Sequence, residues 1–440
     1  MTASERLIVR GPEDILGFIP HSLGYWPASS LVAMTLHGTS LGATLRLDLP
    51  GPQSQAGSAA FASTVRRYLE SDRDADGALL AVFTSDAGIV PPSDCHRLIS
   101  VVQSHLERAG MPVRDAWLVG REYWRDAWCS DGSCCPLPGR PVQEIRDSML
   151  NAEMVYRGSS VGPAPEAGGV APSAGSALHD AAVREAQTGW EAELGGRTRS
   201  RAQFHAVLGF WEMLLDRVGG AAWIPDVERD GFLRATLLIP AWRDAVMVMA
   251  AAGRSAAAAG AEQFGLFPDG EESDGTDVSL LPLLPPAVAS RQSRTRLKAV
   301  GGTGRKAAQV QRAGLGPATP APVSASAPAG YGDVLMGVAP SVPDWAGLDA
   351  LDGVLRELAV PGGPAAAAAL TVRGWVAWSR GRGSYSAAYL GQALELEPGY
   401  RLAELLLNLV GTGTLCGWAA RKEAAWQKFH DGSAWGQEAP

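Results

Sequence analysis

The sequence lacks long apolar runs and familiar catalytic signatures. No stretch reaches the ~18 apolar residues of a membrane helix, because the best candidate, residues 241–252, contains Arg243 and Asp244. The opening MTASERLIVRGPED lacks the basic stretch followed by an apolar run that marks a signal peptide. We therefore expect a cytoplasmic protein without a membrane span. Because no His-Glu-x-x-His pair occurs, the sequence leaves open whether the chain is an enzyme.

The sequence also lacks an excess of positive charge and an even number of cysteines. A net charge of -8 argues against a polyanion-binding surface spread over the whole molecule. The 5 cysteines are more consistent, in a reducing compartment, with buried thiols, metal ligands or redox groups than with a disulfide framework. Their positions therefore matter more than their number.

The length and the changing pattern along the chain predict several domains. At 440 residues the chain exceeds the size at which a single core stops growing. Strand and helix signals alternate at first, helical periodicity follows, then comes a segment rich in Ala, Gly, Pro and Ser, and helical periodicity returns. We predict an α/β domain over 1–157, a helical segment over 176–253, a disordered linker over 254–330 and a helical bundle over 331–430.

The first domain reads as a mixed sheet with flanking helices. The alternation of residues 43–49 indicates a strand with one wet face, hairpin-paired with a strand at 30–36. Because helices separate most of the predicted strands, we expect a mostly parallel sheet in which this hairpin is the antiparallel part. The other predicted elements are helices at 12–23, 59–69 and 93–108 and strands at 6–10, 78–84 and 113–119.

The second half is predicted to be helical after the linker as well as before it. Two of its four C-terminal segments, 365–380 and 384–396, resemble one tetratricopeptide-type unit, with Trp378 on the first helix and Pro398 closing the second. Stacked repeats usually need at least ~3 units, so we interpret the pair as a helical hairpin within a bundle. The flanking segments are 345–358 and 400–409.

The linker separates an acidic run from a basic one. We interpret it as a self-screening, solvated segment, with a nucleic-acid or acidic-partner arm as the alternative. No aromatic residues interleave the basic run, which argues against base stacking. Nucleic-acid binding would use Arg291, Arg294, Arg296, Lys298, Arg305 and Lys306.

Three cysteines within seven residues form the strongest local cluster. Cys129, Cys134 and Cys135 lie in a segment rich in Gly, Asp and Pro. A zinc site would need a fourth ligand, but the spacing lacks the paired two-residue gaps of known zinc modules. A packing role, a metal site, redox chemistry and a Cys129–Cys134 disulfide all stay open. The candidate fourth ligands are Cys95, His96 and Asp131.

A second candidate site lies between the first helix and the first predicted strand of the hairpin. His21 beside Ser22 suggests a base and a nucleophile, but adjacent helical positions point about 100° apart and no acidic orienter is identifiable. We favour structural roles, in which Gly24 adopts a positive φ and His21 bonds to the backbone. The candidate ligand-binding residues are His21, Tyr25 and Trp26.

Three stretches together resemble one known family. They are GPEDILGFIPHSLGYWPASSLVAMTL, YWRDAWCSDGSCCPLPGRPV and GWVAWSRGRGSYSAAYLGQALELEPGYRLAELL. In this order they resemble the actinobacterial domain-of-unknown-function family DUF4192. The resemblance covers nearly the whole chain outside the linker and implies no activity, because the family has none assigned.

Our first functional hypothesis is therefore a non-enzymatic scaffold or regulatory protein that binds another protein. The second is an enzyme whose site lies at the carboxyl edge of the sheet, near His21, Tyr25 and the cysteines. The third is a nucleic-acid-associated protein that acts through the basic linker.

Overall fold

The computed structural model divides into two compact units, residues 1–166 with 427–440 and residues 167–426. We call them the N-terminal unit and the helical unit and describe each by itself. The structure describes residues 9–50, 55–84, 93–162, 164, 177–218, 223–267, 281–286, 330–421 and 423–426.

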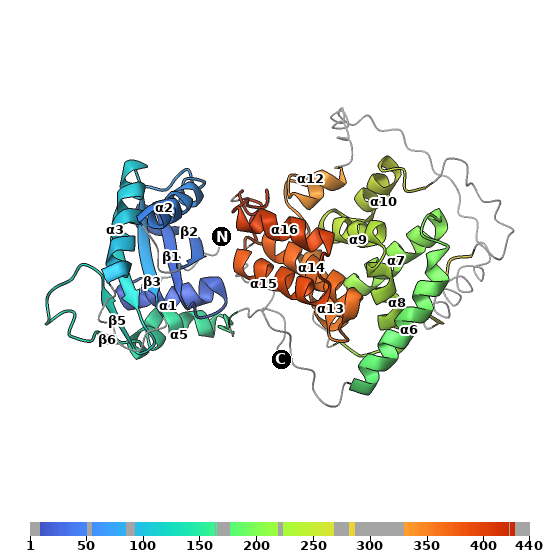
Figure 1. The fold of residues 1–440 in the computed structure, drawn as a ribbon, viewed down its shortest axis with the longest axis horizontal. Helices are drawn as coiled ribbons and strands as arrows, with labels where there is room; N and C mark the ends of the chain where they lie inside the picture. Colours follow the sequence, from blue (N-terminus) through green and yellow to red (C-terminus); the bar gives the residue numbers. More distant parts are fainter. Residues whose placement is uncertain are drawn as a thin grey trace, which may run out of the picture. The chain divides into compact units, whose positions relative to one another are not determined.

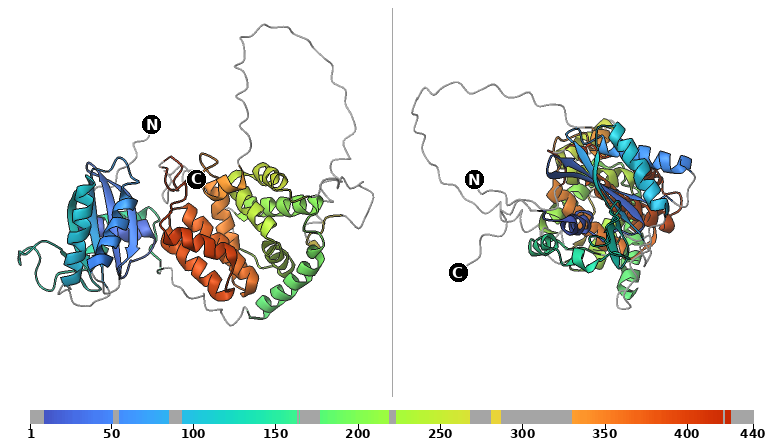
Figure 2. Two further views of the ribbon diagram at one scale, coloured as in Figure 1. Left: turned by 45° about the horizontal axis from the view of Figure 1, so that its top comes forward. Right: turned by 90° about the vertical axis from the view of Figure 1, so that its left-hand side faces the viewer.

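The N-terminal unit contains a six-stranded sheet with helices on both faces (Figures 1 and 2). Apolar side chains of α2 and α3 cover one face, and those of α1 and α4 cover the other. The strand order is β2-β1-β3-β4-β5-β6. The strands are β1 (Ser30–His37), β2 (Ser40–Asp48), β3 (Gly77–Phe83), β4 (Val113–Val119), β5 (Tyr123–Asp126) and β6 (Arg140–Pro141).

The central strands are buried on both faces, as their apolar runs predict. In β3, Leu80 and Val82 point to one helical layer while Leu79, Ala81 and Phe83 point to the other. A strand covered on both faces reads as a continuous apolar run. This explains why the strands at the centre of the sheet could be recognised from sequence.

The expected mostly parallel sheet is wrong. Strand β1 pairs antiparallel with both β2 and β3, and only β3 and β4 pair in parallel. The helix-separated strands β2 and β3 do run in the same direction, but β1 lies between them, so they are not neighbours. The short strands β5 and β6, absent from the prediction, add two further antiparallel pairs.

Proline, glycine and serine residues at the helix ends explain where helices of this unit begin and end. Helix α1 has Pro at its first turn and ends at Gly24, whose φ of 90° lies in the left-handed region. Helix α5 begins after Ser148, whose side chain accepts a hydrogen bond from the Asn151 N–H. Of the predicted strand at 6–10, the described residues 9 and 10 are not in a strand. The helices are α1 (Pro12–Leu23), α2 (Gln55–Leu69), α3 (Ser93–Arg108), α4 (Gln143–Arg146) and α5 (Met149–Tyr156).

The described part of the helical unit consists of helices, turns and loops around one core, in which Trp211, Trp242, Trp375 and Trp418 are fully buried. Helices α14 and α15 pack against each other, as expected for a hairpin. The helices are α6 (Ala177–Gly195), α7 (Arg201–Val218), α8 (Val227–Leu237), α9 (Pro240–Ala252), α10 (Arg254–Gln263), α12 (Tyr331–Leu335), α13 (Trp345–Ala359), α14 (Gly363–Ser379), α15 (Gly383–Leu396) and α16 (Arg401–Gly411).

The predicted linker begins too early. Residues Arg254–Gln263 form helix α10, in which Ala257 and Ala261 belong to the core. Alanine-rich composition is compatible with a helix when one face is buried, so composition alone misplaced this boundary. The remaining linker falls largely on residues 268–280 and 287–329, outside the described residues, and these include all six basic residues assigned to the nucleic-acid arm.

Among the described residues no single helix is long and apolar enough to cross a membrane. Helices α8 and α9 meet the length and composition criteria only as a pair, and the pair bends by 102°. The break coincides with Pro240 at the start of α9, and a proline interrupts the hydrogen bonding of a continuous helix.

Candidate metal centre

The three clustered cysteines lie in the connection between β5 and β6. Their sulfur atoms all lie within 4.8 Å of one another. Cys135 is buried, Cys129 is half-buried and Cys134 is exposed, so the cluster extends from the protein interior to its surface. All five cysteines of the chain are free thiols.

The first end of this connection is fixed by the last residues of β5. A carboxylate oxygen of Asp126 accepts hydrogen bonds from the backbone N–H groups of Trp128 (2.7 Å) and Cys129 (2.8 Å). The Arg125 guanidinium donates to the Cys129 carbonyl at 3.1 Å. An Asp that bonds to the backbone two residues on is a usual turn-forming device. Here it fixes the backbone from which Cys129 projects.

Farther along the connection, a tight turn brings Cys134 and Cys135 toward Cys129. The Cys135 N–H donates to the Asp131 carbonyl at 2.7 Å. A side-chain oxygen of Asp131 accepts from both the N–H and the hydroxyl of Ser133 at 2.8 Å. The sequence spacing lacks the paired two-residue gaps of known zinc modules, but this turn brings both sulfurs close to that of Cys129.

The sulfur separations suit a thiolate-bound ion. With Zn–S bonds of about 2.3 Å, sulfurs in a tetrahedral shell lie about 3.8 Å apart, and in a planar three-sulfur shell about 4.0 Å. The observed limit of 4.8 Å therefore requires a contraction of at most about 1 Å, which side-chain rotation can supply. Cysteine is also the ligand type that selects zinc, copper(I) and iron–sulfur centres.

None of the three expected fourth ligands joins the cluster at this distance in the described part of the chain. Cys95 belongs to the core between the sheet and helices α2 and α3. The Nε2 atom of His96 lies 2.9 Å from the Ala127 carbonyl, to which it donates. Asp131 is engaged by Ser133. The structure therefore brings together three thiols that could hold a metal ion, without a fourth His, Cys, Asp or Glu at this distance among the described residues.

The two neighbouring thiols should slow alkylation of the Cys134 thiol. Its hydrogen bond with Cys129, and then that with Cys135, raise the pKa of the Cys134 thiol from 9.0 to about 11. The thiolate fraction near neutral pH then falls about 100-fold. Because nucleophilicity rises with pKa with a slope of roughly 0.5, we expect metal-free Cys134 to be alkylated about 10-fold more slowly than an ordinary thiol.

Iodoacetamide labelling of the chelator-treated, reduced protein, followed by peptide mass spectrometry, measures this rate. The same peptide in the urea-unfolded chain is the reference, because unfolding separates the three sulfurs. The folded-state rate should rise about tenfold per pH unit up to the pKa of about 11. Equal rates in folded and unfolded protein at pH 7.5 would contradict the predicted pKa shift.

The second candidate site is a packed contact between α1 and α5. The His21 side chain is completely buried. Its Nδ1 atom lies 2.8 Å from the Ser159 hydroxyl and its Nε2 atom 2.8 Å from the Asn151 side-chain oxygen. The Asn151 amide NH₂ donates to the Arg146 carbonyl, which orients the amide oxygen toward the histidine. His21 is thus held by two side chains rather than presented to solvent.

The two aromatic residues of this site also pack internally. Tyr25 is buried and its backbone pairs with Gly162. The ring of Trp26 meets that of Phe83 edge to face at 6.2 Å, and the Arg146 guanidinium lies 5.2 Å from its centre. These contacts join the α1–β1 connection to β3 and α4, as expected for aromatic residues that cover the end of a sheet.

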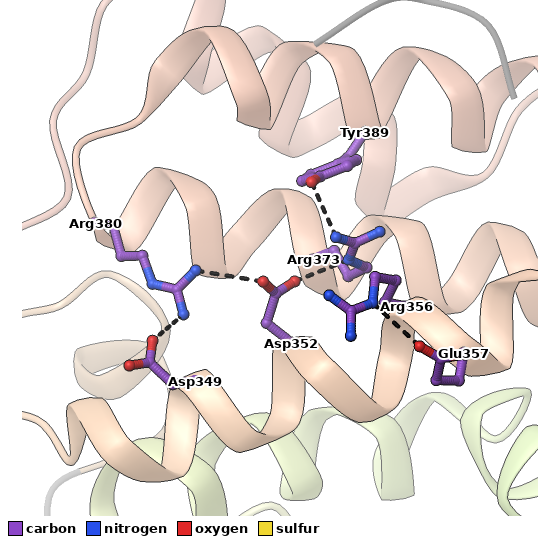
Figure 3. Close-up of polar contacts among 7 residues, drawn as sticks. All are labelled: Asp349, Asp352, Arg356, Glu357, Arg373, Arg380 and Tyr389. Atoms are coloured by element: carbon purple, nitrogen blue, oxygen red, sulfur yellow. Dashed lines mark hydrogen bonds and ion pairs between the residues drawn. The ribbon is translucent and has the colours of Figure 1, made fainter. Parts of the chain in front are cut away.

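A polar cluster in the helical unit was not predicted from the sequence (Figure 3). Asp352 of α13 accepts from Arg373 of α14 at 2.8 Å and from Arg380 at 3.4 Å. Arg380 also bonds to Asp349, and Arg373 donates to the Tyr389 hydroxyl of α15 at 2.9 Å. The two Asp are three positions apart and the two Arg seven, which places each pair on one helix face. This spacing of like-charged residues is the sequence pattern from which the cluster could have been predicted.

The chain folds into two units. The first is a three-layer α/β unit with a thiol-rich loop at the edge of its sheet, and the described elements of the second are all helices. The family model of a domain of unknown function, DUF4192, matches residues 12–263 and 348–414, which is well over half of the chain. The chain belongs to this family, as its three characteristic stretches predicted. No curated protein and no solved structure matches the chain.

Proposed function

We propose that this chain is a non-enzymatic scaffold or regulatory protein that binds another protein, and that α5 supplies part of the binding surface. The observation that carries the proposal is a short helix with two apolar faces. Leu150 and Met154 on one face are buried. On the other, Met149, Val155 and Tyr156 expose 64%, 57% and 87% of their surface.

The exposed residues form one continuous stripe. Met149, Ala152 and Tyr156 are three and seven positions apart, and Val155 adjoins them, so they share one side of the helix. Because α5 carries apolar side chains on the exposed face as well as on the buried one, burying the exposed face against a partner would be favourable. Contiguous exposed apolar surface marks interaction sites. The partner should therefore present an apolar surface of its own.

A photocrosslinking phenylalanine analogue at position 156, used in cells that make the protein naturally, tests this proposal. We expect one defined protein to be crosslinked from this position. Glu107, an exposed residue of α3 in the same unit, is the matched position for the same analogue and should give no such product. In a second variant, Val155→Glu with Tyr156→Glu should abolish co-purification of the crosslinked protein.

Two results would overturn the proposal. One is a product formed only within the same chain. The other is an identical set of products from positions 156 and 107, which would reflect general surface reactivity.

A second proposed function is zinc binding by Cys129, Cys134 and Cys135. The observation that favours it is the approach of three sulfurs to within 4.8 Å on a loop in which the Asp126 and Asp131 side chains accept backbone hydrogen bonds. Thiolate ligands in a preorganised loop bind zinc without the ordering that an open chain requires. Bound zinc would stabilise the β5–β6 connection.

The same proposal includes three finer features. We propose a cytoplasmic, actinobacterial protein, in which reduced thiols remain available for a metal. The linker predicted over 254–330 stays a prediction where it falls outside the described residues. We also propose that α14 and α15 form a tetratricopeptide-like hairpin, supported by Trp378, Tyr385 and Pro398. The nucleic-acid alternative rests on sequence alone, because its basic residues lie outside the described residues.

A further inference from the structure

We propose that the metal centre of Cys129, Cys134 and Cys135 is an open site, in which three thiolates hold the ion and the fourth position accepts a nitrogen or sulfur donor from outside the chain. This inference rests on the proposed zinc binding. It concerns what the bound ion can do, because a closed four-ligand shell is structural while an open position permits ligand exchange.

The first argument is the composition of the site. In the described part of the chain no fourth His, Cys, Asp or Glu joins the three sulfurs within 4.8 Å. Ser133 engages Asp131 through two hydrogen bonds at 2.8 Å, and His96 donates from Nε2 to the Ala127 carbonyl. One carboxylate oxygen of Asp131 accepts both bonds, which hold this side chain on the turn carrying Cys134 and Cys135.

The second argument is the direction in which the cluster opens. Cys135 is 5% exposed and belongs to the protein interior, whereas Cys134 is exposed. An ion bound by all three sulfurs would therefore have protein on the Cys135 side and solvent on the Cys134 side. A solvent molecule or an incoming donor can approach the fourth position from that side.

The third argument is charge. Three thiols release three protons when they bind Zn²⁺, so the complex carries one net negative charge before a neutral fourth ligand is added. The Arg125 guanidinium donates to the Cys129 carbonyl at 3.1 Å, on the backbone that carries one of the three thiols. Because Zn²⁺ favours four ligands, a neutral imidazole or a thiolate can fill the remaining position and displace water.

Cobalt(II) titration of the full-length, metal-free and reduced protein tests the proposal. Co²⁺ replaces Zn²⁺ in tetrahedral thiolate sites, and its visible absorption reports on both the ligand type and their number. We expect one equivalent of Co²⁺ to bind with thiolate charge-transfer absorption. Addition of free imidazole should then change the visible bands while the Co²⁺ stays bound, as equilibrium dialysis can verify.

Two variants identify the ligands. Cys134→Ser changes an exposed loop residue and should weaken Co²⁺ binding at least about 100-fold, since even the loss of a supporting outer-shell contact costs 10–100-fold. Cys416→Ser, at a buried thiol of the helical unit, should leave binding unchanged. Circular dichroism verifies that both variants are folded.

The outcomes separate the two claims. If Co²⁺ binds and imidazole leaves its bands unchanged, a fourth ligand from the chain closes the site and the open-site inference is wrong. If Co²⁺ does not bind to the wild-type protein, or binds equally to the Cys134→Ser variant, the proposed zinc binding is wrong as well.

Discussion

Replacing Arg234 by Met is expected to lower the free energy of unfolding of the helical unit by about 3–5 kcal/mol. Arg234 is 1% exposed. Its guanidinium donates to the Gln187 side chain at 2.8 Å, to the Gly362 carbonyl at 2.6 Å and to the Leu358 carbonyl. Burial lowers its pKa to about 10, with a smaller contribution from Arg184, so the side chain stays charged at neutral pH.

The expected loss of stability is large because the carbonyl groups that bond to Arg234 have no other hydrogen-bond donor within easy reach. Leu358 is in the last turn of α13, where helix carbonyls lack partners within the helix. A cation at this end also interacts favourably with the helix dipole. Methionine fills much of the space but donates nothing, so buried carbonyls would be left without hydrogen bonds. An Arg234→Lys variant should recover only part of the loss, because an ammonium group lacks the planar fork.

This loss can be measured by urea unfolding, with hydrogen exchange of the α14 backbone amides as the readout for the helical unit. Arg356→Met is the matched control. Its side chain is 66% exposed and forms a surface ion pair with Glu357, for which we expect a change of less than about 0.5 kcal/mol. A loss below about 1 kcal/mol for Arg234→Met would show that its hydrogen bonds are replaced by water or rearranged chain.

The second large effect is expected at His21. His21→Ala should lower the free energy of unfolding of the N-terminal unit by about 2–4 kcal/mol, because it opens a cavity and leaves two polar side chains without their partner. Those side chains, Ser159 and Asn151, both lie 2.8 Å from the ring, and Ser159 is itself buried. The contact joins α1 to α5 and to the segment after it.

Hydrogen exchange of the β3 amides measures the stability of this unit alone. His105→Ala is the control, since the only described side-chain bond of His105 is a long, exposed one of 3.4 Å to Ser63. His105→Ala should change the free energy by less than about 0.5 kcal/mol. If His21→Ala leaves β3 equally protected, His21 has no structural role and the hypothesis of a catalytic histidine regains support.

Local patterns were sufficient to predict most elements of secondary structure. The sequence predicted a helix over 12–23 and a strand over 113–119, and α1 and β4 have these bounds. The Pro at the first turn of α1 and the Gly after it act within one or two turns of the chain. The hairpin of β1 and β2 was predicted for the same reason, because its register depends on a short turn and on alternation.

The candidate sites were predicted less well, because each depends on residues far apart in the chain. Cys129, Cys134 and Cys135 were recognised by their density, and a shared metal or a Cys129–Cys134 disulfide stayed open, but their spacing did not match that of known zinc modules. The turn closed by Asp131 brings them together. The partners of His21 come from α5 and beyond, 130 and 138 positions away, and no local pattern encodes them.

The sequence by itself therefore determined most of the long helices, the central strands and the family of this protein. The tertiary structure alone decided that β1 lies between β2 and β3, that His21 is enclosed by α5, and that three thiols converge at the edge of the sheet. The physical reason is the range of the interactions. Periodicity, caps and turns act between neighbours in the chain, whereas strand order and site assembly depend on which apolar faces pack together over long separations.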